Sequence, residues 1–107
     1  MEYKEIFKLK EMLEQAGIPF EFIDRTEDLS RLPNYKECYQ SYQICYPQEK
    51  GRVCSVIEGF SSYGNDADLL EIMGLLTDEE AKNDRVMGWL SAEDVFNRIK
   101  THYENKE

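Results

Sequence analysis

The sequence lacks the long apolar segments that would place it in a membrane. None of its apolar runs approaches the roughly 20 residues of a membrane-spanning helix. The first five residues do not form a basic segment followed by an apolar one, so we expect a cytoplasmic protein. Hydrophobic residues make up 41% and charged residues 33% of the 107 residues. This composition is typical of one folded domain over residues 1–107 rather than of a disordered chain.

Residues that bind metals or act as nucleophiles are few. The sequence has one histidine, His102, and three cysteines, Cys38, Cys45 and Cys54, which form no CxxC motif. An odd number of cysteines without a signal peptide predicts reduced thiols. We find no GxSxG, P-loop or calcium-loop pattern and expect no metal, no cofactor and no catalytic residue. The alternative is a small thiol-dependent enzyme or redox protein that uses Cys45 or Cys54 with an acid or His102.

Basic residues are scarce in the second half of the chain. The net charge is −9, and between residues 58 and 84 eight acids accompany a single base, Lys82. Such a surface repels phosphate, so we expect no direct nucleic-acid binding and infer a basic protein partner. The alternative is that the charge only keeps the protein soluble. The predicted partner-binding residues are the acids of this region and one tyrosine: Glu58, Tyr63, Asp66, Asp68, Glu71, Asp78, Glu79, Glu80 and Asp84.

Aromatic residues, in contrast, are plentiful. Seven tyrosines and one tryptophan exceed what a core of this size must hold. Tyr and Trp supply binding area with little loss of conformational entropy, which favours an interaction surface. The alternative is that the tyrosines pack in the core with only their hydroxyl groups in water.

The apolar periodicity of the first 60 residues predicts a helix and three strands. Residues 3–16 carry one apolar stripe, and Gly17 ends this helix. Strands are predicted at 18–24, 42–46 and 53–60, with any helix between 26 and 39 ending before Gln40. A hairpin loop at 48–51 would place Cys45 opposite Cys54. The inner face of the hairpin would then hold Tyr42, Ile44, Tyr46, Val53 and Ile57.

The last 40 residues predict helices. An apolar body at 69–76 favours a helix capped by Asn65 or Asp66, and further helices are expected at 77–83 and after Ser91. We therefore predict an α+β fold with an N-terminal helix, a three-stranded antiparallel sheet and then two to three C-terminal helices.

An internal repeat marks two of these helix starts. Residues 73–80 read MGLLTDEE and residues 87–94 read MGWLSAED. Each octet carries a hydroxyl residue followed three positions later by an acid, the spacing of a helix cap. Thr77 and Ser91 are thus predicted N-caps, with a full capping box at Thr77 and a weaker one at Ser91.

The segments YQICYP and VIEGFSSYG, together with the two octets, resemble small uncharacterised proteins carried by prophages and mobile elements of gut Gram-positive bacteria. The resemblance covers most of residues 42–100 and implies neither an activity nor a catalytic residue. The fragment GLLTDEE also resembles short oligomerising C-terminal modules, which makes a homo-oligomer one further expectation. The resulting hypothesis is a non-enzymatic, acidic interaction or regulatory protein.

Overall fold

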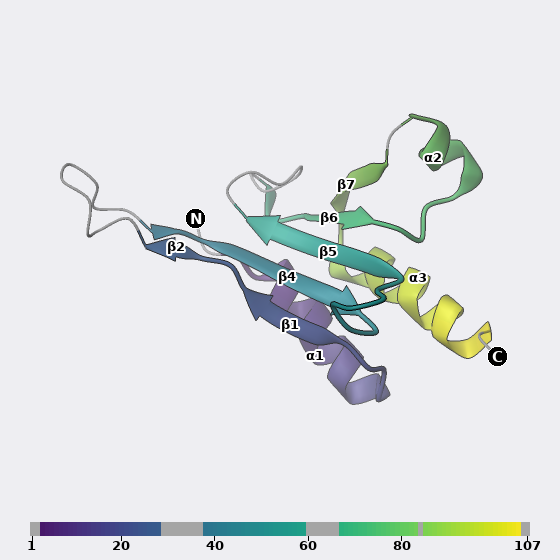
Figure 1. The fold of residues 1–107 in the computed structure, drawn as a ribbon, viewed down its shortest axis with the longest axis horizontal. Helices are drawn as coiled ribbons and strands as arrows, with labels where there is room; N and C mark the ends of the chain where they lie inside the picture. Colours follow the sequence, from purple (N-terminus) through teal and green to yellow (C-terminus); the bar gives the residue numbers. More distant parts are fainter. Residues whose placement is uncertain (1–2, 29–37, 60–66, 84, 106–107) are drawn as a thin grey trace.

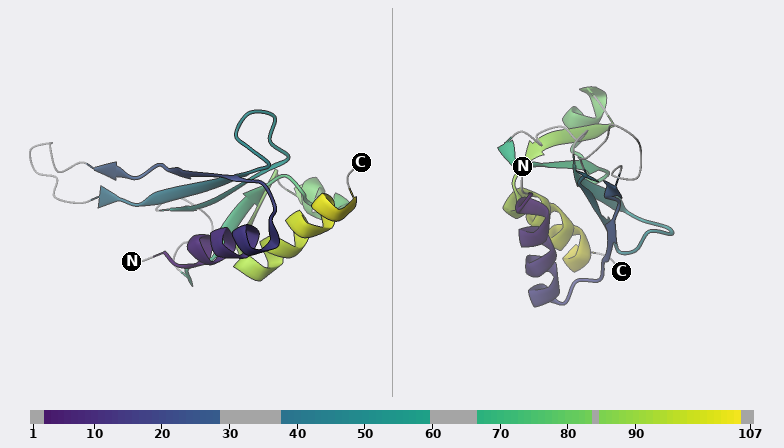
Figure 2. Two further views of the ribbon diagram at one scale, coloured as in Figure 1. Left: turned by 90° about the horizontal axis from the view of Figure 1, so that it is seen from below. Right: turned by 90° about the vertical axis from the view of Figure 1, so that its left-hand side faces the viewer.

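Two long helices, α1 (Glu5–Ala16) and α3 (Ala92–Asn105), pack against one face of a five-stranded antiparallel sheet (Figures 1 and 2). The strand order is β1 (Glu21–Asp24), β4 (Ser41–Tyr46), β5 (Cys54–Gly59), β6 (Leu70–Met73) and β7 (Val86–Leu90). The short strands β2 (Glu27–Asp28) and β3 (Cys38–Tyr39) pair with each other, and α2 (Asp78–Asn83) connects β6 to β7. This computed structural model describes residues 3–28, 38–59, 67–83 and 85–105.

The first helix forms as its sequence predicts. Ile6, Leu9 and Leu13 fall on one stripe and are fully buried against the sheet and α3. Gly17 ends the helix in the left-handed region, at a φ of 69°, and its N–H bonds to the carbonyl groups of Leu13 and Glu14.

The hairpin of β4 and β5 confirms both predicted strands, but the predicted register is wrong by one residue. Cys45 faces Ser55, and Tyr46 faces Cys54. The Val53 N–H donates to the Tyr46 carbonyl at 2.7 Å, so the connection is longer than the predicted four-residue loop. Because side chains alternate along a strand, a one-residue shift exchanges the two faces of β5. The inner face of this strand holds Cys54, Val56 and Glu58 in place of Val53 and Ile57.

The predicted helix at 69–76 is also wrong, because β6 occupies its centre. Leu70 and Ile72 are fully buried, whereas Met73 is 49% exposed, so the segment alternates with the period of a strand. It lies between β5 and β7, and β7 is itself a strand that the sequence did not reveal. These two strands turn the predicted three-stranded sheet into a five-stranded one.

The structure leaves the predicted short helix before Gln40 untested and contains no membrane-spanning helix among its described residues. Residues 29–37, where a short helix was considered, lie outside the described residues, and β2 and β3 flank them. Within the described ranges, no helix is long and apolar enough to cross a membrane.

The core lies between the helices and the inner face of the sheet. Its fully buried members come from both helices and the central strands: Ile6, Leu9, Leu13, Ile44, Val56, Leu70, Ile72, Val95 and Ile99. Two tyrosines are part of this interior, since Tyr3 and Tyr46 are buried. Tyr42 stacks on Phe22 and contacts Phe7 edge to face. For these three tyrosines the core interpretation is correct.

Candidate binding groove

The first octet forms a junction between a strand and a helix. After β6 the chain turns through Gly74 and Leu75, which both have positive φ angles, of 100° and 54°. The Thr77 hydroxyl accepts a hydrogen bond from the Glu80 N–H at 3.2 Å, and the Glu80 carboxylate accepts one from the Thr77 N–H at 2.9 Å. The predicted full capping box is therefore confirmed.

The second octet repeats this junction. Trp89 occupies the position of Leu75 and also has a positive φ, of 61°, next to an irregularity in the pairing of β6 with β7. Its side chain is 60% exposed. Ser91 caps α3, because its hydroxyl accepts the Asp94 N–H at 3.2 Å. The predicted N-caps, the fifth residue of each octet, are thus both confirmed.

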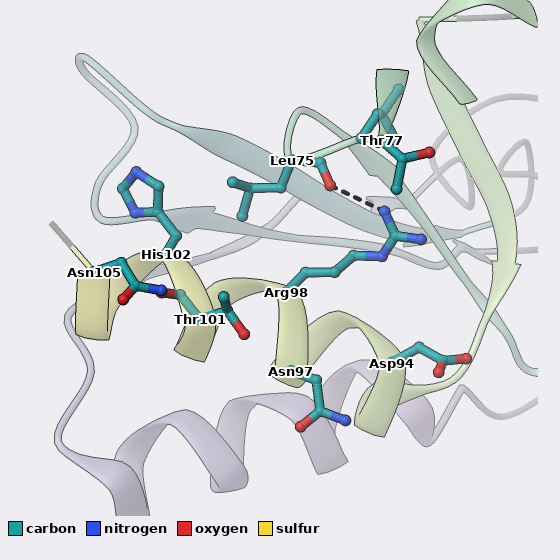
Figure 3. A pocket seen from close by; sticks show the side chains of 9 residues that line it. Leu75, Thr77, Asp94, Asn97, Arg98, Thr101, His102 and Asn105 are labelled. Carbon is teal, nitrogen blue, oxygen red and sulfur yellow. Dashed lines mark hydrogen bonds between the residues drawn. The ribbon is translucent and has the colours of Figure 1, made fainter. Parts of the chain in front are cut away.

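A groove of about 720 Å³ lies between the first junction and the outer side of α3 (Figure 3). The turn after β6 contributes apolar side chains, and successive turns of α3 contribute mainly polar ones. The lining residues are Leu75, Leu76, Thr77, Asp94, Asn97, Arg98, Thr101, His102 and Asn105.

Arg98 fixes the two walls of this groove to each other. Its guanidinium donates to the Leu75 carbonyl at 2.9 Å and makes two parallel bonds of 2.8 Å to the Glu80 carboxylate. Hydrogen bonds from Arg98 and from the Thr77 N–H lower the pKa of Glu80 to about 2. A bidentate pair of this kind has one favoured geometry, so it holds α2 against α3.

His102 lies at the other end of the groove and is tied to the core. Its Nδ1 lies 2.8 Å from the hydroxyl of Tyr46, which is buried at the end of β4. Burial raises the pKa of Tyr46, so the hydroxyl in this hydrogen bond stays protonated near neutral pH. The His102 side chain is half-buried and oriented by this bond.

Within the described residues, the acids predicted to bind a partner do not form one surface. Glu58 is fully buried, so its assignment to an exposed binding surface is wrong. Asp68 accepts hydrogen bonds from the start of α1, and Glu80 is paired with Arg98. Asp78 and Glu79 are exposed on α2, and Glu71 is half-buried on β6. Three predicted residues, Tyr63, Asp66 and Asp84, lie outside the described residues.

The two central cysteines lie in surroundings that oppose thiol chemistry. Cys45 and Cys54 are both free and buried. Burial raises the pKa of both thiols, that of Cys54 to about 12, so neither is a thiolate near neutral pH. Among the described residues, no three His, Cys, Asp or Glu side chains come together as metal ligands.

The groove residues Leu75, Asn97, Arg98 and Thr101 were not identified from the sequence. They come from two segments about 20 residues apart, and only the tertiary packing of α3 places them side by side. The octet repeat was the one available signal, because it singled out Thr77 and the helix start beside it.

Comparison with protein-family models, with curated proteins and with solved structures finds no match for this chain. Its function must therefore be inferred from the chemistry of its own residues.

Proposed function

We propose that the protein is a non-enzymatic protein-interaction module whose groove binds a partner segment with apolar and basic side chains. The observation that carries this proposal is the pairing of an apolar wall, Leu75 and Leu76, with a charged edge formed by Asp94 (Figure 3). Grooves that combine an apolar wall with a few polar groups are the usual form of a binding site.

The apolar wall supplies the affinity expected of such a site. Leu75 and Leu76 are half-buried and pack against the core, which leaves part of each side chain open to the groove. Covering an apolar partner side chain here would contribute about 1.5–3 kcal/mol if its burial is complete. The positive φ of Leu75 places this side chain in a backbone conformation that non-glycine residues rarely adopt.

The charges around the groove favour a basic partner. Arg98 is neutralised by its two bonds to Glu80. Asp94 is exposed at the groove, and Asp78 and Glu79 are exposed on the adjoining α2. The net charge of −9 would steer a basic protein toward this surface and raise its association rate at low salt.

The walls are held in place before any partner binds. The Glu80–Arg98 pair and the Thr77 capping box fix α2 and the preceding turn against α3. A site that is already ordered loses less conformational entropy on binding, so the same contacts give a higher affinity.

The test is selection of peptides from a displayed random library, followed by calorimetry with the purified protein. We expect the selected peptides to combine Lys or Arg with Leu or aromatic residues. Asp94→Lys should weaken their binding about tenfold, equivalent to about 1.4 kcal/mol. Glu93→Lys is the matched control, because Glu93 is an exposed acid in the same helical turn that does not line the groove.

A second variant tests the apolar wall. Leu75→Asn removes the apolar side chain, and asparagine tolerates the left-handed conformation of this position. It should weaken peptide binding in a protein that still unfolds cooperatively, although the lost packing of Leu75 lowers the unfolding temperature. Selected peptides that are acidic, or affinities unchanged in both groove variants, would overturn the proposal. Size-exclusion chromatography of the free protein shows whether a second copy of the chain occupies the groove instead.

A further inference from the structure

The buried Glu58 is the least expected side chain of the interior. It lies on the inner face of β5, opposite Tyr42 on β4, and is fully buried. Its Oε1 accepts a hydrogen bond from the Ile6 N–H in the first turn of α1, at 3.1 Å. Its Oε2 has no hydrogen-bond donor among the described residues. A buried carboxylate oxygen without a donor is costly, so this atom needs an explanation.

Asp68 supplies that explanation from the segment before β6. Its Oδ1 accepts hydrogen bonds from the N–H groups of Lys4, at 2.8 Å, and Glu5, at 3.2 Å. Asp68 therefore caps α1 from a distant part of the chain, and it does so with a positive φ of 55°. Although burial opposes the effect, hydrogen bonds with Glu58 and from the two N–H groups lower the pKa of Asp68.

A third carboxylate extends this cluster to the second helix. Glu5, in the first turn of α1, accepts a hydrogen bond from the Ala92 N–H at the start of α3, at 2.6 Å. The three carboxyl groups of Glu58, Asp68 and Glu5 thus connect β5, the segment before β6, α1 and α3. Together they satisfy N–H groups in the first turns of both long helices.

We propose that Glu58 and Asp68 share one proton, and that this proton acts as a pH-sensitive clamp that holds the N-terminus of α1 on the sheet. With the proton on Glu58 Oε2, the acid donates to the Asp68 carboxylate, and the buried Oε2 gains a partner. When the proton leaves, two carboxylates face each other away from water, and their repulsion opposes the docking of α1.

The surroundings of the pair set the direction of this effect. Burial, followed by the interaction with Asp68, raises the pKa of Glu58 to about 8. Negative charge on Glu5 adds to this rise, whereas the hydrogen bond from Ile6 N–H opposes it. The charged or titratable groups of the packed elements also include Lys4 and the buried Tyr3 before α1, Tyr42 on β4, Glu71 on β6, and the exposed Glu93 and Asp94 in the first turn of α3.

The sign of the pH dependence follows from these shifts. Because the folded protein holds the Glu58 proton more tightly than the unfolded chain, the contribution of Glu58 is complete below pH 4.5. That contribution is lost as the pH rises from 4.5 to about 8. Asp68 acts in the opposite sense at the acidic end, since its lowered pKa makes its capping bonds weaken as it becomes protonated.

The experiment is amide hydrogen exchange of the full chain between pH 6 and 10, corrected for intrinsic exchange rates. Protection of the Lys4, Glu5 and Ile6 amides should fall about tenfold or more as the pH rises from 6 to about 8, and it should level off above pH 8. The Leu13 amide, in the last turn of the same helix, should change less. Glu58→Gln can still accept from Ile6 and donate to Asp68 without titrating, so its first-turn protection should not depend on pH. Glu93→Gln is the control and should behave like the wild type.

Two results would overturn the proposal. One is first-turn protection that is independent of pH in the wild type, and the other is a pH dependence that persists unchanged in Glu58→Gln. If Glu58→Gln does not fold, the side-chain carboxyl carbon of Glu58 can be titrated by NMR in the unmodified protein. A midpoint near 8 supports the shared proton, whereas an ordinary midpoint near 4.5 refutes it.

Discussion

The two octets that begin at Met73 and Met87 build similar local structures and serve different purposes. In both, the third residue has a positive φ and a hydroxyl residue caps the following helix. Yet α2 has 6 residues, none of them buried, whereas α3 has 14 and buries Ala92, Val95 and Ile99. The short sequence pattern therefore determines the junction, and the apolar residues that follow it determine whether the helix joins the core.

The capping acids of the two octets also differ in their partners. Glu80 is long enough to return to the Thr77 N–H and to reach Arg98 on α3. In the second octet, Glu5 of α1 accepts the Ala92 N–H next to the Ser91 cap. At the start of α2 the free N–H group of Thr77 is satisfied from within its own octet, whereas at the start of α3 the N–H group of Ala92 is satisfied by a side chain of α1. The first arrangement holds α2 against α3 beside the groove, and the second connects the start of α3 to α1.

The largest effect is expected from Gly74→Ala, which breaks the first junction alone. A Cβ at this position would overlap the Val53 carbonyl oxygen and would sit at a φ of 100°. We expect a loss of about 3 kcal/mol in the free energy of unfolding, measured by urea denaturation. Gly51→Ala is the control, because its φ of 74° is similar but no atom lies within 4 Å of the added Cβ. Equal losses in both variants would show that backbone strain, and not the close approach to β5, requires Gly74.

A smaller effect is expected from Glu80→Gln, which keeps the cap and removes the charge that pairs with Arg98. We expect a loss of about 1–2 kcal/mol at pH 7, since the pair is bidentate and both side chains are partly shielded from water. Because the pKa of Glu80 is lowered to about 2, the wild-type advantage is present above pH 4.5 and is lost as the pH falls toward 2.

Urea denaturation of wild type and variant at pH 7 and pH 3 measures this dependence. Asp94→Asn, at the equivalent position of the second octet, is the matched control and should change stability by less at both pH values. A difference between wild type and Glu80→Gln that is the same at pH 7 and pH 3 would contradict the assigned ion pair.

The smallest effects separate the two caps themselves. Ser91→Ala should cost about 1 kcal/mol, because α3 packs in the core and its cap stabilises the folded state fully. Thr77→Ala should cost about 0.5 kcal/mol, because α2 is short and buries no residue. Thermal unfolding of the two variants measures the comparison. Equal losses would mean that the Glu80–Arg98 pair makes α2 as integral to the fold as α3.

Local features of this protein were predictable from its sequence. The stripe of Ile6, Leu9 and Leu13 with its Gly17 stop, and the caps at Thr77 and Ser91, depend on residues within a few positions of one another. Hydrogen bonds and steric limits at that range are nearly independent of the rest of the chain, so a pattern is enough to identify them.

The tertiary structure decided the features that depend on pairing between distant segments. An apolar run such as residues 69–76 is compatible with either a helix or a strand. Pairing with β5 on one side and β7 on the other makes its centre a strand. A register that differs by one residue from the predicted one reverses the two faces of β5. Glu58 therefore points into the interior, next to Asp68 and the start of α1. The groove exists because Arg98 reaches Glu80 and Leu75 from another helix. Such long-range contacts decide which acidic side chains are buried or paired and which are exposed. Composition shows only that the acids are numerous, so it could not show that several of the predicted binding residues are not free on the surface.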